Sequence, residues 1–205
     1  MKTLEIRRHS IRAKPGAHLS QAGLELARRV GRSMGSFDRV VTSELPRALE
    51  TAVAMGFAVG EQCAALNTIE DQAAVDAEVD LAKASFAELA RAAARGGALA
   101  RLGRRQSEAW LRLAASIPEG GRLLIVAHGG LIEPGAAVAL PDEDFAAWGP
   151  NLGFCEGVRL SVNGGAILAG QPLRVRSEQP SRSRSPTKRR GALPTAGRKR
   201  KGAKR

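Results

Sequence analysis

Two histidines of this chain each follow a segment with the pattern of a buried β-strand. His9 follows the alternating apolar and charged residues 4–8, and His128 comes directly after the apolar run 122–127. Ligands of open α/β sheets bind just outside the carboxyl ends of the strands. We therefore expect both imidazoles to converge on one crevice. A third histidine, His18, lies in a polar segment, where we expect it to be merely solvated.

The sequence around His9 is rich in arginine. Arg7 and Arg8 precede the histidine, and Arg12 follows it. Guanidinium groups form bidentate hydrogen bonds with phosphate oxygens, and a neutral imidazole can attack phosphorus. These residue types side by side predict a phosphate site. An exposed basic strand end that binds nothing has the same local pattern, so this interpretation needs a second observation.

A further arginine follows the next predicted strand. Residues 40–42 are all β-branched, Ser43 stands at their end, and Arg47 fits the first turn of a helix. The free N–H groups and the dipole of a helix favour anions at its N-terminus. Arg47 could complete a phosphate cage there with Arg8. Taken alone, an arginine at this position would be expected to form a surface ion pair with a nearby glutamate.

The rest of the pattern predicts the elements that position these side chains. We expect strands at 4–8, 38–42, 66–69 and 122–127, helices at 21–33, 46–56, 73–94, 107–116 and up to 139, and a hairpin at 158–162 and 166–168. Ser20 is the expected N-cap of the first helix. Strands that alternate with helices indicate an α/β fold, here a three-layer α/β/α sandwich with a mostly parallel central sheet.

Charge is distributed unevenly along the chain. Of the 205 residues, 32 are Lys or Arg and 20 are Asp or Glu, which gives a formal net charge of +12. Residues 174–205 hold 13 of the bases and one acid, so residues 1–173 carry 19 of each. This argues against a wholly basic, histone-like protein. We expect a catalytic domain at 1–173 and a disordered basic tail at 174–205, because the tail has almost nothing apolar to bury.

Composition excludes other classes. The longest apolar runs are far shorter than the ~20 residues of a membrane helix, and the first residues lack the apolar core of a secretory signal. The cysteines, Cys63 and Cys155, have neither metal-binding spacing nor a disulfide pattern, so we expect free thiols in a cytoplasmic protein. Tyrosine is absent, which argues against aromatic stacking of nucleic acid on the body. The tail could contact nucleic acid or another polyanion weakly.

Three motifs, taken in their order along the chain, resemble the histidine phosphatase superfamily. They are Arg8-His9, then Ser43 with Arg47-Ala48 and Thr51-Ala52, then Ala127-His128-Gly129. The likeness spans about residues 3–170, and residues 18–23 are similar to the helix start L-[ST]-x-x-G of that family. The family includes cofactor-dependent phosphoglycerate mutases and many small phosphatases. The resemblance therefore implies a phosphoglycerate mutase-like fold and a small phosphatase.

The resemblance also implies a mechanism through phosphohistidine. His9 would be the nucleophile, Arg8 and Arg47 would hold the transferring phosphoryl group, and His128 would form a hydrogen bond to its oxygens. Such a pocket works by positioning and by stabilising negative charge, so we expect neither a metal nor a cofactor. Because His9 must be neutral at the attacking nitrogen, we expect a carbonyl or carboxylate at its other nitrogen.

The chain departs from the family pattern at two places near His9. The usual Arg-His-Gly is Arg8-His9-Ser10 here. If the third position needs positive φ, serine is less suitable than glycine, although its hydroxyl could contact phosphate instead. The Thr and Asn typical of the mutase branch are missing. Ser10-Ile11-Arg12 is similar to the acid phosphatase branch, which implies Arg12 as an extra phosphate ligand.

Protonation of the leaving group calls for a carboxylic acid. Glu70 or Asp71 occupies the stretch where the mutase-like branch has a glutamate, but the customary neighbours are missing. Glu133, five residues after His128, is another candidate, and an acid there is equally typical of a helix N-terminus. We take Glu70 as the first choice. A phosphoamidate or another good leaving group would reduce the need for any acid.

The sequence thus predicts hydrolysis of a small phosphorylated substrate, a phosphomonoester or phosphoamidate. Two alternatives stay open. One is a phosphoglycerate mutase-type phosphotransferase, which the missing mutase residues disfavour. The other is a catalytically degenerate phosphatase fold that binds nucleic acid through its basic tail. Residues 66–121 contain no motif that identifies the substrate, and nothing in the sequence indicates the oligomeric state.

Overall fold

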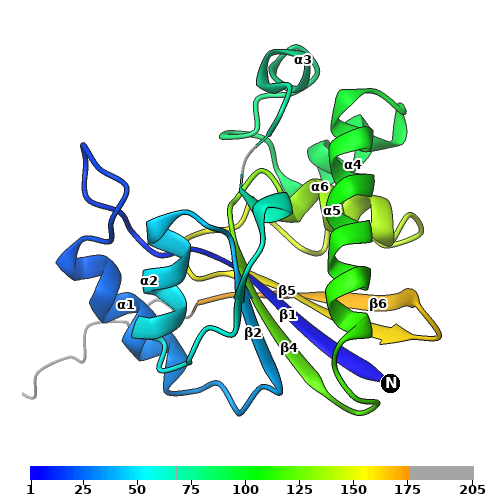
Figure 1. Cartoon of the computed structure of the whole chain (residues 1–205). Helices are drawn as coiled ribbons and strands as arrows, with labels where there is room; N and C mark the ends of the chain where they lie inside the picture. The colour runs from blue at the N-terminus through cyan, green and yellow to red at the C-terminus, as the bar shows by residue number, and fades with distance from the viewer. Residues whose placement is uncertain (68, 176–205) are drawn as a thin grey trace, which may run out of the picture. The chain divides into compact units, whose positions relative to one another are not determined.

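A mixed sheet of six strands runs through the computed structural model, which describes residues 1–67 and 69–175 (Figure 1). The strand order is β3 (Glu61–Gln62), β2 (Arg39–Thr42), β4 (Arg122–Ala127), β1 (Lys2–Arg8), β5 (Gly157–Asn163) and β6 (Ala166–Leu173). The first four strands run parallel, and β5 is antiparallel to both β1 and β6. The predicted mostly parallel sheet and its terminal hairpin are confirmed.

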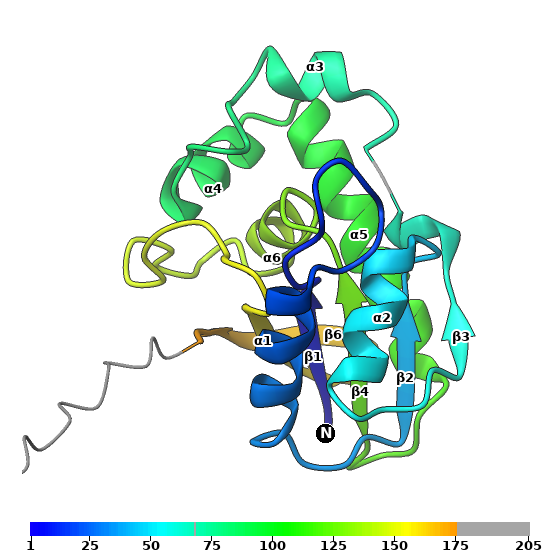
Figure 2. The same ribbon diagram turned by 90° about the vertical axis from the view of Figure 1, so that its left-hand side faces the viewer.

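Helices cover both faces of this sheet, which confirms the three-layer α/β/α arrangement (Figures 1 and 2). On one face lie α4 (Phe86–Ala94), α5 (Ala98–Ala115) and α6 (Ile132–Ala139), and on the other lie α1 (Gln21–Gly31) and α2 (Pro46–Ala54). Side chains alternate along β4: Leu123 and Ile125 pack in the cluster with α4, α5 and α6, whereas Leu124 and Val126 pack with α2. Among the described residues, no helix is long and apolar enough to cross a membrane.

The start of α1 is fixed by a cap and by a close backbone contact. Ser20 is the N-cap, as predicted, and its hydroxyl accepts a hydrogen bond from the backbone N–H of Gly23 at 3.1 Å. A Cβ at Gly23 would lie 2.0 Å from the carbonyl oxygen of Ile11. Only glycine therefore lets α1 pack directly on the segment that follows His9.

Several predictions between residues 61 and 116 were wrong. The strand expected at 66–69 is instead the two-residue β3 followed by a short 3-10 helix at Ala64–Leu66. The single helix expected at 73–94 is two helices, α3 (Gln72–Asp76) and α4, because Ser85 and Glu88 form a capping box that starts α4. Helix α5 begins at Ala98, well before residue 107, because the Glu78 carboxylate accepts hydrogen bonds from the first N–H groups of that helix.

The described fold extends beyond the predicted domain end at residue 173. Arg174 forms an ion pair with Glu156 at 2.7 Å, and the backbone N–H of Val175 donates to the same carboxylate at 3.1 Å. Arg174 therefore belongs to the folded part, although the sequence placed it in the tail. The remainder of the predicted tail, residues 176–205, lies outside the described residues.

Candidate active site

The two histidines lie together because their strands are neighbours. Strands β1 and β4 run parallel and in register, with Arg8 opposite Ala127, so the residues that follow them leave the sheet side by side. The rings of His9 and His128 have centroids 5.1 Å apart, and these residues are only 7% and 6% exposed. The expected convergence of both imidazoles at the carboxyl ends of the strands is thus found.

Hydrogen bonds fix the proton position of His9. Its Nδ1 lies 2.7 Å from the carbonyl oxygen of Ser10, and because a carbonyl only accepts, Nδ1 must carry the proton. The lone pair therefore lies on Nε2, which accepts a hydrogen bond from Nε of Arg47 at 3.1 Å. Burial lowers the pKa of His9 to about 4, and the charges of Arg47 and Arg8 add to this effect. At neutral pH the His9 ring is therefore uncharged.

His128 is held by the residue at the end of β2. Its Nε2 lies 2.8 Å from the hydroxyl of Ser43, a fully buried residue. Burial first, and then the nearby His9, Arg47 and Arg8, lower the pKa of His128 to about 3. Among the described residues its Nδ1 has no hydrogen-bond partner. The His128 ring is therefore neutral and held at Nε2 by Ser43, whereas its Nδ1 is available for a further hydrogen bond.

Arg8 lies across the loop that follows His128. One terminal nitrogen donates to the carbonyl oxygen of Leu152 at 2.5 Å, and its guanidinium carbon lies 4.7 Å from the centre of the Phe154 ring. A Cβ at Gly129 would come within 3.0 Å of the Arg8 side chain, so the glycine permits this close approach. The Nε of Arg8 is buried with no partner among the described residues.

Arg47 is tied to the His9 segment through Thr51, to which the sequence analysis gave no role. The Thr51 hydroxyl donates to the carbonyl oxygen of Arg47 at 2.6 Å and accepts from the backbone N–H of Ser10 at 2.9 Å. Residues four apart share a helix face, so the Arg47–Thr51 spacing was the available signal. This link sets the distance between α2 and the end of β1.

The Ser10 hydroxyl is bound to the backbone of α1. It donates to the carbonyl oxygen of Gly23 at 2.7 Å, and the residue has no exposed surface. Ser10 is also not among the described residues with positive φ, so its backbone does not require glycine. The structure does not bring this hydroxyl to the histidine pair as a phosphate contact, and Ser10 instead anchors α1.

Arg12 lies in an exposed loop beside the histidine pair. Arg12 forms a β-bridge with Leu19, and the loop is fastened to α2 because Glu50 accepts from Nδ1 of His18 and from the N–H of Leu19 (Figure 2). The charge of Arg12 contributes to lowering the pKa of His9, which indicates proximity. His18, expected to be merely solvated, is exposed but forms this hydrogen bond with Glu50.

The three candidate acids all have partners elsewhere. Glu70 pairs with Arg105 of α5 and its side chain is 75% exposed, and Asp71 caps α3. Glu133 is completely buried, and it accepts from the N–H groups of Gly130 at 2.7 Å and Leu152 at 3.3 Å. Burial raises the pKa of the Glu133 carboxyl. No described contact joins any of these carboxyl groups to His9.

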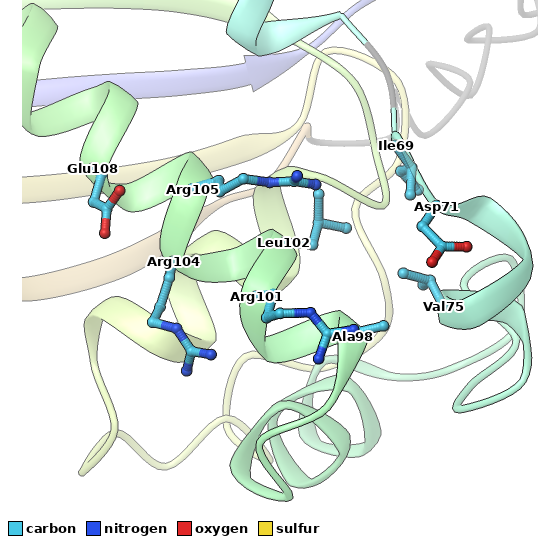
Figure 3. Close-up of a pocket in the computed structure, with 9 residues that line it drawn as sticks. All are labelled: Ile69, Asp71, Val75, Ala98, Arg101, Leu102, Arg104, Arg105 and Glu108. Atoms are coloured by element: carbon cyan, nitrogen blue, oxygen red, sulfur yellow. The ribbon is translucent and has the colours of Figure 1, made fainter.

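A cavity of about 440 Å³ lies apart from this site, between α3 and α5 (Figure 3). Its lining residues are Ile69, Asp71, Val75, Ala98, Arg101, Leu102, Arg104, Arg105 and Glu108. None of these is one of the histidines or arginines around His9. The candidate site is therefore the histidine pair with its arginines, and this cavity is separate from it.

The chain is similar to known proteins in both sequence and fold. Residues 3–167 match the histidine phosphatase superfamily (branch 1). A phosphoserine phosphatase from Entamoeba histolytica, solved with 3-phosphoglyceric acid, superposes with a TM-score of 0.62 at 17% identity, covering 85% of this chain and 98% of that chain. A mycobacterial glucosyl-3-phosphoglycerate phosphatase gives 0.56 at 24% identity, with 78% and 93% covered. YhfR of Bacillus stearothermophilus gives 0.59 at 21%, with 82% and 95% covered. Among curated proteins, no sequence matches the chain.

Proposed function

Because the chain belongs to the histidine phosphatase superfamily, we propose that it hydrolyses phosphomonoesters or phosphoamidates through a phosphohistidine at His9. One observation carries this proposal. The hydrogen bond from Nδ1 of His9 to the Ser10 carbonyl leaves the lone pair on Nε2, and a guanidinium lies beside that atom. A nucleophile with its lone pair directed at a cationic pocket is the arrangement that phosphoryl transfer requires.

The reaction has two steps. In the first, Nε2 of His9 attacks phosphorus and the N–P bond forms. The bond from phosphorus to the leaving group breaks, its electron pair goes to the leaving group, and the leaving group takes a proton from solvent. In the second, water attacks phosphorus and releases one proton to solvent, the N–P bond breaks with its electron pair returning to Nε2, and inorganic phosphate leaves. Arg8, Arg47 and His128 would stabilise the negative charge on the phosphoryl oxygens in both steps. We assign Arg12 as an additional ligand at the entrance.

The proposed substrate is a small phosphorylated molecule. Two of the structural neighbours are a phosphoserine phosphatase and a glucosyl-3-phosphoglycerate phosphatase, and we extend only the broad class of small phosphorylated molecules to the present chain. The arginines of the cage supply the positive charge that a metal ion would otherwise place beside the phosphoryl oxygens, so we propose that the enzyme works without a metal ion or cofactor. We also propose that the enzyme acts in the cytoplasm.

The test compares full-length wild type with His9→Ala on an aryl phosphate, in buffer with a chelator. The proposal expects turnover by wild type, none by His9→Ala, and an acid-labile phosphoprotein when wild type is quenched during turnover. Glu119→Gln is the control, since that carboxylate is exposed and pairs with the N-terminal amine, at the end of β1 opposite His9. An inactive wild type with no trapped phosphohistidine, across phosphorylated metabolites and a phosphohistidine peptide, would falsify the proposal. Transfer to a phosphorylated acceptor in place of water would identify a mutase.

A further inference from the structure

One loop lies against both Arg8 and His9. We call residues 149–156 the cover loop. Its Phe154 ring lies 4.7 Å from the guanidinium carbon of Arg8 and 5.9 Å from the centre of the His9 ring. Its Leu152 carbonyl accepts the hydrogen bond from Arg8 at 2.5 Å. The cover loop therefore determines where the Arg8 guanidinium lies.

The cover loop contains an unfavourable backbone conformation. Cys155 has φ of 59°, which makes it the only non-glycine residue with positive φ among those described. It is fully buried, its N–H donates to the Arg8 carbonyl at 3.1 Å, and its carbonyl accepts from Arg7 at 2.9 Å. Such a conformation costs about 1 kcal/mol or more and persists only when the surrounding contacts enforce it. Contacts outside the loop must therefore hold it.

Arg174 supplies several of these contacts from a single side chain. Its guanidinium donates to three carbonyl oxygens in or next to the cover loop and forms an ion pair with the loop's last residue; the partners are Trp148, Pro150, Asn151 and Glu156. The Glu156 carboxylate in turn accepts from the N–H of Gly153 at 2.8 Å. A planar guanidinium reaches several acceptors at once, which a lysine ammonium on its flexible stem does less well.

The buried Glu133 holds the cover loop from a second direction. One carboxyl oxygen accepts from the N–H of Leu152, and the other accepts from the N–H of Gly130, two residues after His128. The Leu152 carbonyl that binds Arg8 therefore belongs to a residue whose N–H donates to Glu133. The residue before it, Asn151, accepts from Arg174, and the residue after it, Gly153, donates to Glu156, the partner of Arg174. The position of Arg8 depends on both supports, and Arg174 is the one that also spans the two ends of the loop.

We propose that Arg174 is a positioning residue: it holds the cover loop so that the Leu152 carbonyl and the Phe154 ring fix Arg8 for the phosphoryl group. This inference rests on the proposed function. Arg174 contacts neither histidine in the described structure and acts through the loop. Because a displacement of about 1 Å can cost roughly 100-fold in rate, loss of this support should weaken phosphate binding and turnover without removing the nucleophile.

The experiment uses the full chain with Arg174→Ala, Arg174→Lys and Arg159→Ala. Arg159 is the control, because it is an arginine of β5 that pairs with Glu5 and forms no described hydrogen bond with the cover loop itself. The readouts are binding of inorganic phosphate by calorimetry, kcat/KM for an aryl phosphate, and Tm. We expect Arg174→Ala to lose about 10- to 100-fold in phosphate affinity and kcat/KM. Added guanidinium ion should restore part of both, and Arg174→Lys should lie between wild type and Arg174→Ala.

Arg159→Ala should lower Tm with little change in phosphate affinity. The inference is overturned if folded Arg174→Ala binds phosphate as wild type does, or if Arg159→Ala with an equal loss of Tm loses the same affinity. If Arg174→Ala fails to fold, the Lys variant decides by the same comparison, since it keeps a cation beside Glu156. Arg174-dependent phosphate binding in a wild type that never hydrolyses would support the positioning role and reject the proposed function.

Discussion

The Nε–H of Arg47 donates to Nε2 of His9 across 3.1 Å, so the side chain proposed to receive the phosphoryl oxygens also contacts the atom proposed to attack phosphorus. This contact holds Nε2 in a fixed direction before any substrate binds. Thr51 and Ser10 connect the two residues through the backbone as well. The nucleophile and one wall of the cage are therefore a single unit.

Arg47→Ala should lower kcat/KM for an aryl phosphate by roughly 100- to 1,000-fold, the loss typical when one charge-stabilising donor is removed. Arg47→Lys should restore only a small part, because an ammonium does not reproduce the fork of a guanidinium. Steady-state kinetics measure this, with Arg28→Ala of α1, an exposed arginine, as the control. If Arg47→Ala kept the wild-type rate, Arg47 would not bind the phosphoryl group and would form only a surface ion pair with a nearby glutamate.

The acidic limb of the pH–activity profile should lie at lower pH than an ordinary histidine would give. Burial first, and then Arg47 and Arg8, lower the pKa of His9 to about 4, and the attacking Nε2 must be unprotonated. Activity should therefore persist at pH 5 and fall as the pH drops through about 4, well below the ordinary histidine pKa of about 6.5. A kcat/KM profile measures this. An acidic limb near pH 6.5 would contradict the buried, cation-flanked environment of His9.

The lowered histidine pKa values also predict an effect on stability. Unfolded His9 and His128 take up protons below about pH 6.5, whereas the folded histidines remain neutral until about pH 4 and 3. The free energy of unfolding should therefore fall as the pH drops from 6.5 toward 4, because the unfolded state binds more protons in that range. Denaturant titrations at several pH values should show a smaller loss for the double variant His9→Gln with His128→Gln.

The sequence was informative where function depends on neighbours in sequence or on strand ends. The apolar run 122–127 predicted β4, and because β1 lies parallel to it, His9 and His128 had to meet. The sequence was uninformative where a contact joins distant residues. Glu78 caps α5, and Arg174 binds the cover loop. Neither contact produces a periodic sequence pattern, because each joins residues that only the tertiary fold brings together.

Ser10→Ala should separate a structural role from a phosphate contact. The hydroxyl donates to the buried carbonyl of Gly23, so its removal should lower the free energy of unfolding by about 1 kcal/mol. The KM and kcat should stay within about twofold of wild type, since typical neutral hydrogen bonds away from the reacting atoms change stability and not rate. Chemical denaturation and steady-state kinetics decide this. A large rise in KM with unchanged stability would show that the Ser10 hydroxyl contacts the phosphate.

The basic segment outside the described residues should bind polyanions in a salt-dependent way. Residues 176–205 contain 12 of the 32 Lys and Arg residues and a single acid. Replacing residues 198–201, Arg-Lys-Arg-Lys, by serine in the full chain should reduce the dependence of log K on log salt by up to about 4. Fluorescence titration with RNA measures this slope, and aryl phosphate hydrolysis should not change. An unchanged slope would remove these four residues from the contact.

Glu70→Gln tests the acid that the sequence favoured. The Glu70 carboxylate pairs with Arg105 on α5, its side chain is 75% exposed, and no described contact joins it to His9. We therefore expect alkyl phosphate hydrolysis, the reaction most dependent on leaving-group protonation, to stay within about twofold of wild type, against the 100-fold or greater loss typical of a removed general acid. The control is Glu108→Gln, because Glu108 lies on α5 and lines the same cavity as Arg105, the partner of Glu70. An alkyl-specific loss in Glu70→Gln, with aryl phosphate turnover retained, would mean that substrate binding draws Glu70 away from Arg105 to the leaving group.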